Sequence, residues 1–227
     1  MEINYQIIRS RKRRKTLSLK ITAQGAVVIQ APYHTPPEEI ALFFARKKAW
    51  LEEKLLQFRE LAAPPPSQPL ISGQALLFLG VSYPLIVGNQ GSQVELFTLK
   101  ERHFVLNSRV VHHGRALARS WYEAQARIYL SQRIGDYEKT WDLRPRGVRI
   151  SNAASRWGSC SPMNLLSFTW RLMMAPPHVI DYVIVHELAH IGEKNHSRRF
   201  WDLVSRMMPD YQTHRRWLRE QGHRLRL

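Results

Sequence analysis

The chain has 227 residues, a formal net charge of +16 and a sequence pI near 10.5. This length favours one compact domain, or a small domain with an appendage, and the hydrophobic fraction of 44% is ordinary for a globular core. The single cysteine, Cys160, excludes an internal disulfide and a zinc cluster built from cysteines.

The N-terminal segment shows neither a signal-peptide pattern nor a membrane span. Residues 1–5 lead directly into a basic run, and no uncharged apolar stretch is long enough to cross a bilayer. We therefore expect a reduced, cytoplasmic location and no membrane partner. In that setting Cys160 is expected to be a small packed residue.

The first third of the chain predicts strands followed by one long helix. Residues 17–21 alternate with period two, Gln24-Gly25 marks a turn, and residues 26–29 form a second strand of a β-hairpin. Apolar residues then recur at helical spacing over 37–61, with Glu38 and Glu39 in a favourable first turn. We expect its aromatic stripe to be core packing.

A proline-rich linker at 64–69 separates this part from the rest. Beyond it, short apolar runs split by glycines predict a small antiparallel unit or meander; these runs are 75–79, 82–87, 93–99 and 103–107. The later periodicity predicts helices at 112–139, 197–208 and 210–221, and strands at 148–150 and 165–172.

The order of these elements favours an α+β fold over alternating βαβ units. We expect three parts along the chain: an N-terminal β-hairpin and helix region over 1–62, the linker and meander over 63–110, and a catalytic core over 111–227.

Two basic clusters carry much of the charge. Six of the seven residues from Arg9 to Lys15 are basic, and the stretch from His214 to Arg226 contains five arginines and one acid, Glu220. One interpretation is a surface for nucleic acid, nucleotide phosphates or acidic proteins. The alternative is a solvated hairpin turn and a frayed tail, and no nucleic-acid-binding motif accompanies the charge.

The sequence His186-Glu187-Leu188-Ala189-His190 is a zinc-site pattern with a mechanism attached. Histidines at i and i+4 share one helix face and can reach one metal ion, and Glu187 can take a proton from the metal-bound water. His196 lies beyond Gly192, a good helix stop, and can return as third ligand. Three protein ligands leave a fourth position open, as a catalytic zinc requires.

The context of the motif supports this interpretation. Chance would place HExxH in a chain of this composition about 2% of the time, and the specified third histidine lowers this to roughly 0.1%. The preceding segment 179–185 is strongly apolar, and Pro176 and Pro177 suit a helix start. A polar triad on a buried helix would be costly without a ligand.

Four further stretches stand out along the chain: the basic N-terminal stretch from Arg9 to Trp50, SRWGSC at 155–160, PPHVIDYVIVHELAH at 176–190 and NHSRRFW at 195–201. With these motifs, nearly the whole chain resembles the YgjP-like metallopeptidase family. The family is related to the SprT and WLM/Spartan zinc proteases. Those proteases have an aromatic pair soon after the third histidine, and Phe200-Trp201 matches this pair. The resemblance implies a zincin-like catalytic domain with a small antiparallel sheet whose edge strand lies beside the active-site helix.

Two departures from related patterns matter. The family pattern is usually HELCHL, whereas this chain has Ala189 and Ile191, both conservative for packing. Metzincins share the ligand spacing but place glycine at the eighth motif position, where this chain has Glu193. Because Met207-Met208 reads as core rather than a Met-turn, the metzincin interpretation is disfavoured.

The favoured hypothesis is a zinc peptidase with one Zn²⁺. Histidines 186, 190 and 196 hold the metal, which depresses the pKa of its water toward about 7, and Glu187 transfers the proton to the leaving amine. A substrate peptide is expected to lie along the strand 165–172 by β-augmentation. Asp181 points to another helix face, which argues against a role at the metal. Candidates for stabilising the oxyanion are Arg156, Tyr182 and Tyr211.

Two alternatives stay open at this point. A metal-dependent nucleoside triphosphate pyrophosphatase or other phosphoanhydride hydrolase would suit the positive charge, but the chain has no P-loop and no carboxylate cluster for Mg²⁺. A DNA-associated protease would suit the kinship with Spartan and the basic surface.

Overall fold

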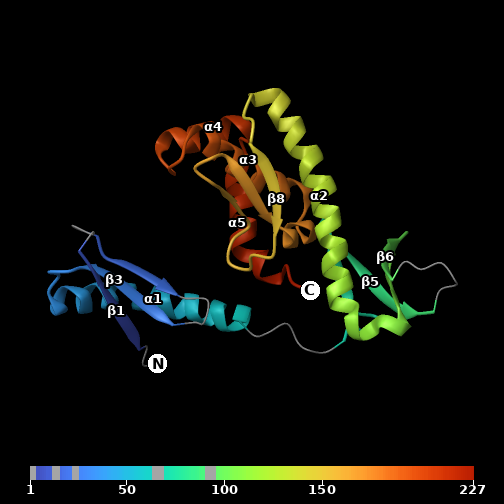
Figure 1. Cartoon of the computed structure of the whole chain (residues 1–227), viewed down its shortest axis with the longest axis horizontal. Helices are drawn as coiled ribbons and strands as arrows, with labels where there is room; N and C mark the ends of the chain where they lie inside the picture. The colour runs from blue at the N-terminus through green and yellow to red at the C-terminus, as the bar shows by residue number, and fades with distance from the viewer. Residues whose placement is uncertain (1–3, 12–15, 22–25, 63–68, 90–95) are drawn as a thin grey trace. The chain divides into compact units, whose positions relative to one another are not determined.

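The structure is a computed structural model that describes residues 4–11, 16–21, 26–62, 69–89 and 96–227. The chain divides into two compact units, Met1–Pro66 and Ser67–Leu227 (Figure 1). The predicted turn at Gln24-Gly25, basic residues 12–15 and most of the predicted linker at 64–69 lie outside the described residues. The domain boundaries at 62/63 and 110/111 stay predictions.

The first unit is a three-stranded sheet with one long helix. Its elements are β1 (Tyr5–Ser10), β2 (Ser18–Ile21), β3 (Val27–Pro32) and α1 (Pro37–Ala62). The predicted hairpin is confirmed, because β2 pairs antiparallel with β3. The sheet is nevertheless mixed, because β1 pairs parallel with the other side of β3. Ile40 of α1 packs with Ile29 and Ala31 of β3, and Phe43 and Phe44 pack against this cluster, so this part of the predicted stripe is core packing. The side chain of Trp50 lies outside the described residues.

The second unit begins with a four-stranded sheet made of β4 (Ala75–Phe78), β5 (Val81–Gly88), β6 (Phe97–Lys100) and β7 (His103–Asn107). The predicted meander is wrong: the strand order is β4-β5-β7-β6, and β5 pairs parallel with β7. The two hairpins β4–β5 and β6–β7 are both present. The second hairpin presents its later strand to β5, a choice of partner that the period of a strand does not determine.

A second sheet in this unit consists of β8 (Gly147–Ser151), β9 (Gly158–Cys160) and β10 (Leu165–Thr169), in the order β8-β10-β9. β10 pairs parallel with β8 and antiparallel with β9, so the expectation of a purely antiparallel sheet is also wrong. The strand predicted at 165–172 ends at Thr169, where a 3-10 turn at Trp170–Met174 begins.

The position of β10 overturns the predicted substrate register. Both edges of β10 are hydrogen-bonded to neighbouring strands. A peptide cannot add to a central strand, because its backbone donors and acceptors are already paired. Within the described residues, the edge strand next to the motif helix is β9.

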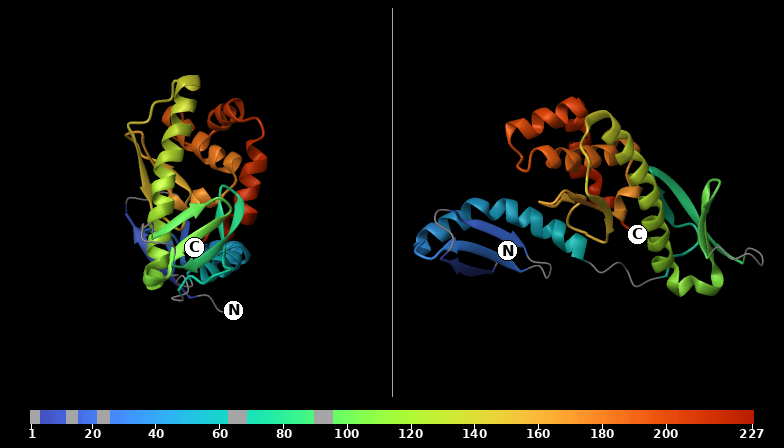
Figure 2. Two further views of the ribbon diagram at one scale, coloured as in Figure 1. Left: turned by 90° about the vertical axis from the view of Figure 1, so that its right-hand side faces the viewer. Right: turned by 45° about the horizontal axis from the view of Figure 1, so that its top comes forward.

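The helices of this unit build its core around the motif helix. They are α2 (Gly114–Trp141), α3 (Pro177–Gly192), α4 (Arg198–Met207) and α5 (Tyr211–Gln221), with short 3-10 turns at Ser108–His113 and Gly222–Arg224. Figures 1 and 2 show α2 running past both sheets of the unit. α3 contacts α2, α4, α5 and β9, and both Met207 and Met208 belong to the core as predicted.

The start of α3 is held by the tip of the β4–β5 hairpin. Leu79 and Gly80 take positive φ angles of 48° and 79°, as a tight hairpin turn requires. The Leu79 N–H donates to the Met173 carbonyl at 2.7 Å. A Cβ built on Gly80 would lie 2.9 Å from the Cα of Pro176, the N-cap of α3. The turn therefore contacts the backbone at the start of the motif helix.

An ion pair connects α2 to the middle of α3. Both terminal oxygens of Asp181 accept hydrogen bonds from the Arg133 guanidinium, at 3.0 and 2.7 Å. Such a bidentate pair fixes orientation as well as distance. Asp181 thus faces α2, and its role is to anchor the helix.

None of the helices that the structure describes combines the length and the hydrophobicity that a membrane crossing requires.

Alanine at Gly80 should destabilise the chain more than alanine at Gly73. Both glycines have positive φ, 79° and 85°, but a Cβ on Gly73 meets nothing within 4 Å. Each substitution is expected to cost about 1 kcal/mol from the backbone conformation. Gly80→Ala should cost roughly 1–3 kcal/mol more because of the contact with Pro176. Urea unfolding measures the difference, and equal losses for the two variants would contradict the packing described here.

Candidate metal centre

The motif lies on α3, a helix buried along most of its length. Pro176 is its N-cap and Pro177 its first residue, as predicted, since proline needs no backbone hydrogen bond there. The helix ends at Gly192, also as predicted. The cause differs from the expected one: the next residue, Glu193, is extended at φ −128°, and no left-handed glycine terminates the helix.

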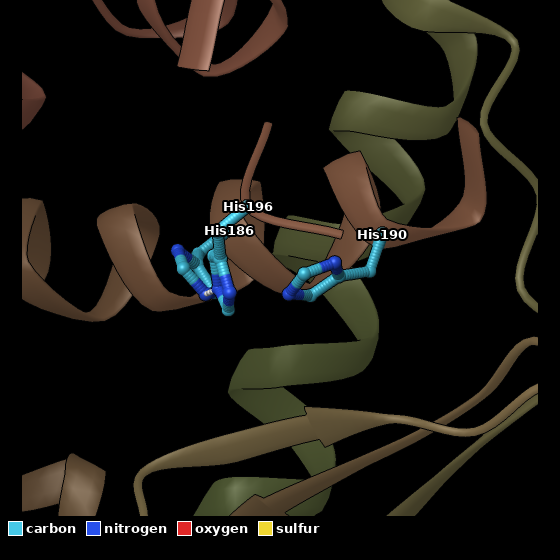
Figure 3. A group of neighbouring side chains, drawn as sticks. All are labelled: His186, His190 and His196. Carbon is cyan, nitrogen blue, oxygen red and sulfur yellow. Dashed lines mark hydrogen bonds between the residues drawn. The ribbon is translucent and has the colours of Figure 1, made fainter. Parts of the chain in front are cut away.

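The structure brings the three predicted histidines together. His186 and His190 are one turn apart on α3, and the loop 193–197 returns His196 toward them (Figure 3). One ring nitrogen from each residue lies within 4.8 Å of the other two. The Nε2 atoms of His186 and His196 are 3.0 Å apart. The predicted spacing therefore produces a convergent triad.

The segment after His196 fixes the position of its ring. The Ser197 side chain caps α4 by accepting a hydrogen bond from the Phe200 N–H at 3.4 Å. This start places two aromatic rings on the triad: Phe200 stacks on His190 at 4.4 Å and Trp201 stacks on His196 at 5.8 Å between centroids. The aromatic pair that carried part of the family resemblance is thus a wall of the site.

Hydrogen bonding leaves a free ring nitrogen on His190. Its Nδ1 lies 3.0 Å from the Glu193 carbonyl oxygen, and because a carbonyl can only accept, Nδ1 carries the proton. Nε2 then carries no hydrogen, and its lone pair is available to a metal ion, as in metal-binding histidines. The Nδ1 of His186 is buried and has no hydrogen-bond partner among the described residues.

The spacing of the three histidines fits a metal ion. The facing Nε2 atoms of His186 and His196, 3.0 Å apart, can form an N–H···N hydrogen bond, or both can present lone pairs to one cation. Burial, followed by the neighbouring His190 and His196, lowers the pKa of His186 to about 3, so its ring is neutral near pH 7 and can offer a lone pair to a metal. Tetrahedral zinc with nitrogen ligands at about 2.0–2.1 Å places those nitrogens about 3.3 Å apart, close to the spacing seen.

Glu187 is a buried carboxyl beside this triad. The residue is only 5% exposed. Burial raises its pKa to about 7, against a smaller lowering by the Arg156 guanidinium. A Cβ built on Gly158 of β9 would lie 2.6 Å from both Cγ and Oε1 of Glu187. The absence of a side chain at residue 158 therefore makes room for the carboxyl.

An open cavity of about 350 Å³ adjoins His186 and Glu187. Besides these two, it is lined by Arg156, Trp157, Gly158, Tyr182, Val183, Arg215, Leu218 and Arg219. Two of the three oxyanion candidates, Arg156 and Tyr182, line it. Tyr211 does not line it; its ring stacks on Trp201 at 5.4 Å.

Sequence reasoning missed the contributions of β9 and α5 to the site. Gly158 lies inside the SRWGSC motif, yet the motif alone gave no hint that residue 158 packs on Glu187. Arg215 and Arg219 belong to the C-terminal basic cluster, whose i, i+4 spacing on a predicted helix was the available signal. Cys160 is half-buried on β9 near Lys194, and burial raises the pKa of its thiol.

Three convergent histidines, a buried carboxyl and an open cavity define a candidate metal-dependent hydrolase centre. Comparison with protein families agrees with this class: the YgjP-like metallopeptidase domain matches residues 15–221. The chain therefore belongs to the YgjP-like metallopeptidase family.

Comparisons with individual proteins give less. No curated protein matches the chain. Among solved structures, the metallopeptidase zymogen abylysin of Pyrococcus abyssi matches with 17% identity and a TM-score of 0.37. The match covers 40% of this chain and 93% of abylysin.

Gly158→Ala should reduce peptide hydrolysis about 100-fold or more while metal content persists. The added Cβ would overlap the Glu187 carboxyl, and a displacement of about 1 Å can cost that factor in a catalytic site. Gly135→Ala on α2 is the matched control, since its Cβ meets nothing within 4 Å. Metal analysis and kcat/KM on one peptide measure both effects, and full activity in Gly158→Ala would contradict a fixed carboxyl.

Proposed function

We propose that this chain is a zinc-dependent metallopeptidase that hydrolyses peptide bonds, with His186, His190 and His196 holding one zinc ion and Glu187 as general base. One observation carries the proposal. The three imidazole nitrogens converge, and a buried carboxyl lines the same cavity as one of the histidines. Membership of a metallopeptidase family supports the peptide as substrate.

The number and type of donors favour catalytic zinc. Imidazole nitrogens suit zinc and related metals, whereas Mg²⁺ and Ca²⁺ prefer oxygen. Among the described residues, the group capable of holding a metal contains three side chains and no fourth ligand, which is the pattern of a catalytic site. When bound, zinc lowers the pKa of water toward about 7 and polarises a carbonyl group.

Glu187 is suited to move one proton in each direction. With a pKa of about 7, its carboxylate can accept a proton near neutral pH and its acid form can return that proton to a leaving amine. Gly158 and the walls of α3 and β9 hold it in place, so little reorientation is needed between the two transfers.

The free edge of β9 is the better place for a peptide to bind. β9 contacts α3, and its Gly158 lies against Glu187. Its inner edge pairs with β10 over Gly158–Cys160, which leaves the outer edge for an added strand within the described structure. Main-chain hydrogen bonds along that edge would align a peptide beside the carboxyl without depending on its sequence.

Glu187→Gln should retain the metal and lose hydrolysis. Glutamine preserves the shape of the side chain but cannot take a proton, and general acid–base groups contribute about 10²–10⁴-fold in rate. Zinc content and kcat for a peptide substrate measure the two effects. Glu138→Gln on α2 is the control, because Glu138 lines no part of the cavity.

Two results would contradict the assigned role. Unchanged hydrolysis in Glu187→Gln would remove Glu187 as the base. Loss of zinc in the same variant would instead make Glu187 a metal ligand.

A further inference from the structure

The cavity beside the triad carries an excess of positive charge. Three of its lining residues are arginines, Arg156, Arg215 and Arg219, and its one acidic residue is Glu187. The guanidiniums come from two separate elements, the segment before β9 and the helix α5. We call these three residues the arginine rim.

Two members of the rim are presented on one face of α5. Arg215 and Arg219 are four residues apart, which places both on the same side of the helix. The Arg215 guanidinium lies 4.7 Å from the centroid of the Trp201 ring, and this cation–π contact orients it beside the triad. Arg219 makes one loose ion pair with Glu220, at 3.6 Å on the exposed surface.

The third member is available for a ligand. Arg156 is exposed and makes no hydrogen bond or ion pair with any residue that the structure describes. Its guanidinium acts electrostatically on the Glu187 carboxyl, so it lies close to the chemical site. Arginine can bind a carboxylate through two parallel hydrogen bonds.

Behind the rim the lining is apolar. Val183, Leu218 and Tyr182 are 4%, 8% and 5% exposed. A volume of about 350 Å³ with apolar walls and cationic groups suits one side chain with a short hydrocarbon stem and an anionic head. A nucleoside triphosphate would bring several more charges and a magnesium ion, for which the lining offers no second carboxylate.

We propose that the arginine rim binds a carboxylate of the substrate, so that peptides with an acidic residue next to the scissile bond, or with a free terminal carboxylate there, are preferred. This inference rests on the proposed peptidase function for its meaning, but it can be tested by binding alone. The rim is a specificity determinant for the reaction.

The probes are three peptides, two with an amidated C-terminus and one with a free C-terminal carboxylate. Two acetylated, amidated pentapeptides differ only in a central glutamate or glutamine, and a third has a central alanine and a free terminal carboxylate. Binding is measured by calorimetry on the full chain carrying Glu187→Gln, and kcat/KM is measured on the unaltered chain. We expect a carboxylate peptide to bind about tenfold more tightly than the glutamine peptide, and the ratio to fall with salt. The carboxylate peptide that binds more tightly shows whether the rim binds a side-chain carboxylate or a terminal carboxylate.

Variants of the rim locate the effect. The double variant Arg156→Gln, Arg219→Gln should bring the ratio close to one. Arg216→Gln is the matched control, since Arg216 is exposed on α5 but does not line the cavity, and it should keep the ratio.

Three results would overturn the inference. All three peptides could bind equally well, or the carboxylate peptides could fail to bind. The preference for a carboxylate peptide over the glutamine peptide could also persist in the double variant. Displacement of the glutamate peptide by a triphosphate at lower concentration than by free peptide would assign the rim to phosphate and also overturn it. A tenfold ratio in binding without hydrolysis by the unaltered chain would sustain the inference and refute the proposed function.

Discussion

The site depends on the burial of ionisable side chains on α3. The helix is buried because it completes the core, and its burial also removes His186 and Glu187 from solvent. Burial raises the pKa of Glu187 to about 7 and lowers that of His186 to about 3, so both are disfavoured in their charged forms. Charged or unpaired groups cost several kcal/mol in such a place. The proposed metal ion, held jointly by His186, His190 and His196, would offset this cost and let α3 serve both as core and as the site.

The surrounding elements are arranged to hold this helix still. The β4–β5 turn abuts its N-cap residue, Pro176, and Arg133 binds Asp181 within the helix. The cap on α4 fixes the return of the chain to His196. β9 comes close enough to Glu187 that a side chain at residue 158 would displace the carboxyl. Positions within about 0.5 Å decide whether such a site works, so these remote contacts belong to its chemistry.

Local patterns in the sequence predicted the helices and the triad because their spacing is short-range. His186 and His190 share a helix face because they are four residues apart. His196 follows so soon after α3 that one reversal of the chain brings it back to them. Partner choice between strands could not be predicted, because period-two alternation does not say which strand lies beside which. β10 therefore proved central where an edge was expected, and the role of Gly158 appeared only once β9 was placed against α3.

The central claim is that three histidines hold one metal ion, and X-ray absorption with metal analysis tests it most directly. We predict about one zinc ion per chain, with three nitrogen ligands and one oxygen at about 2.0–2.1 Å, and loss of that zinc in His196→Ala. A sulfur ligand at about 2.3 Å, which would have to be Cys160, would contradict it. So would an unchanged equivalent of zinc in the His196→Ala protein.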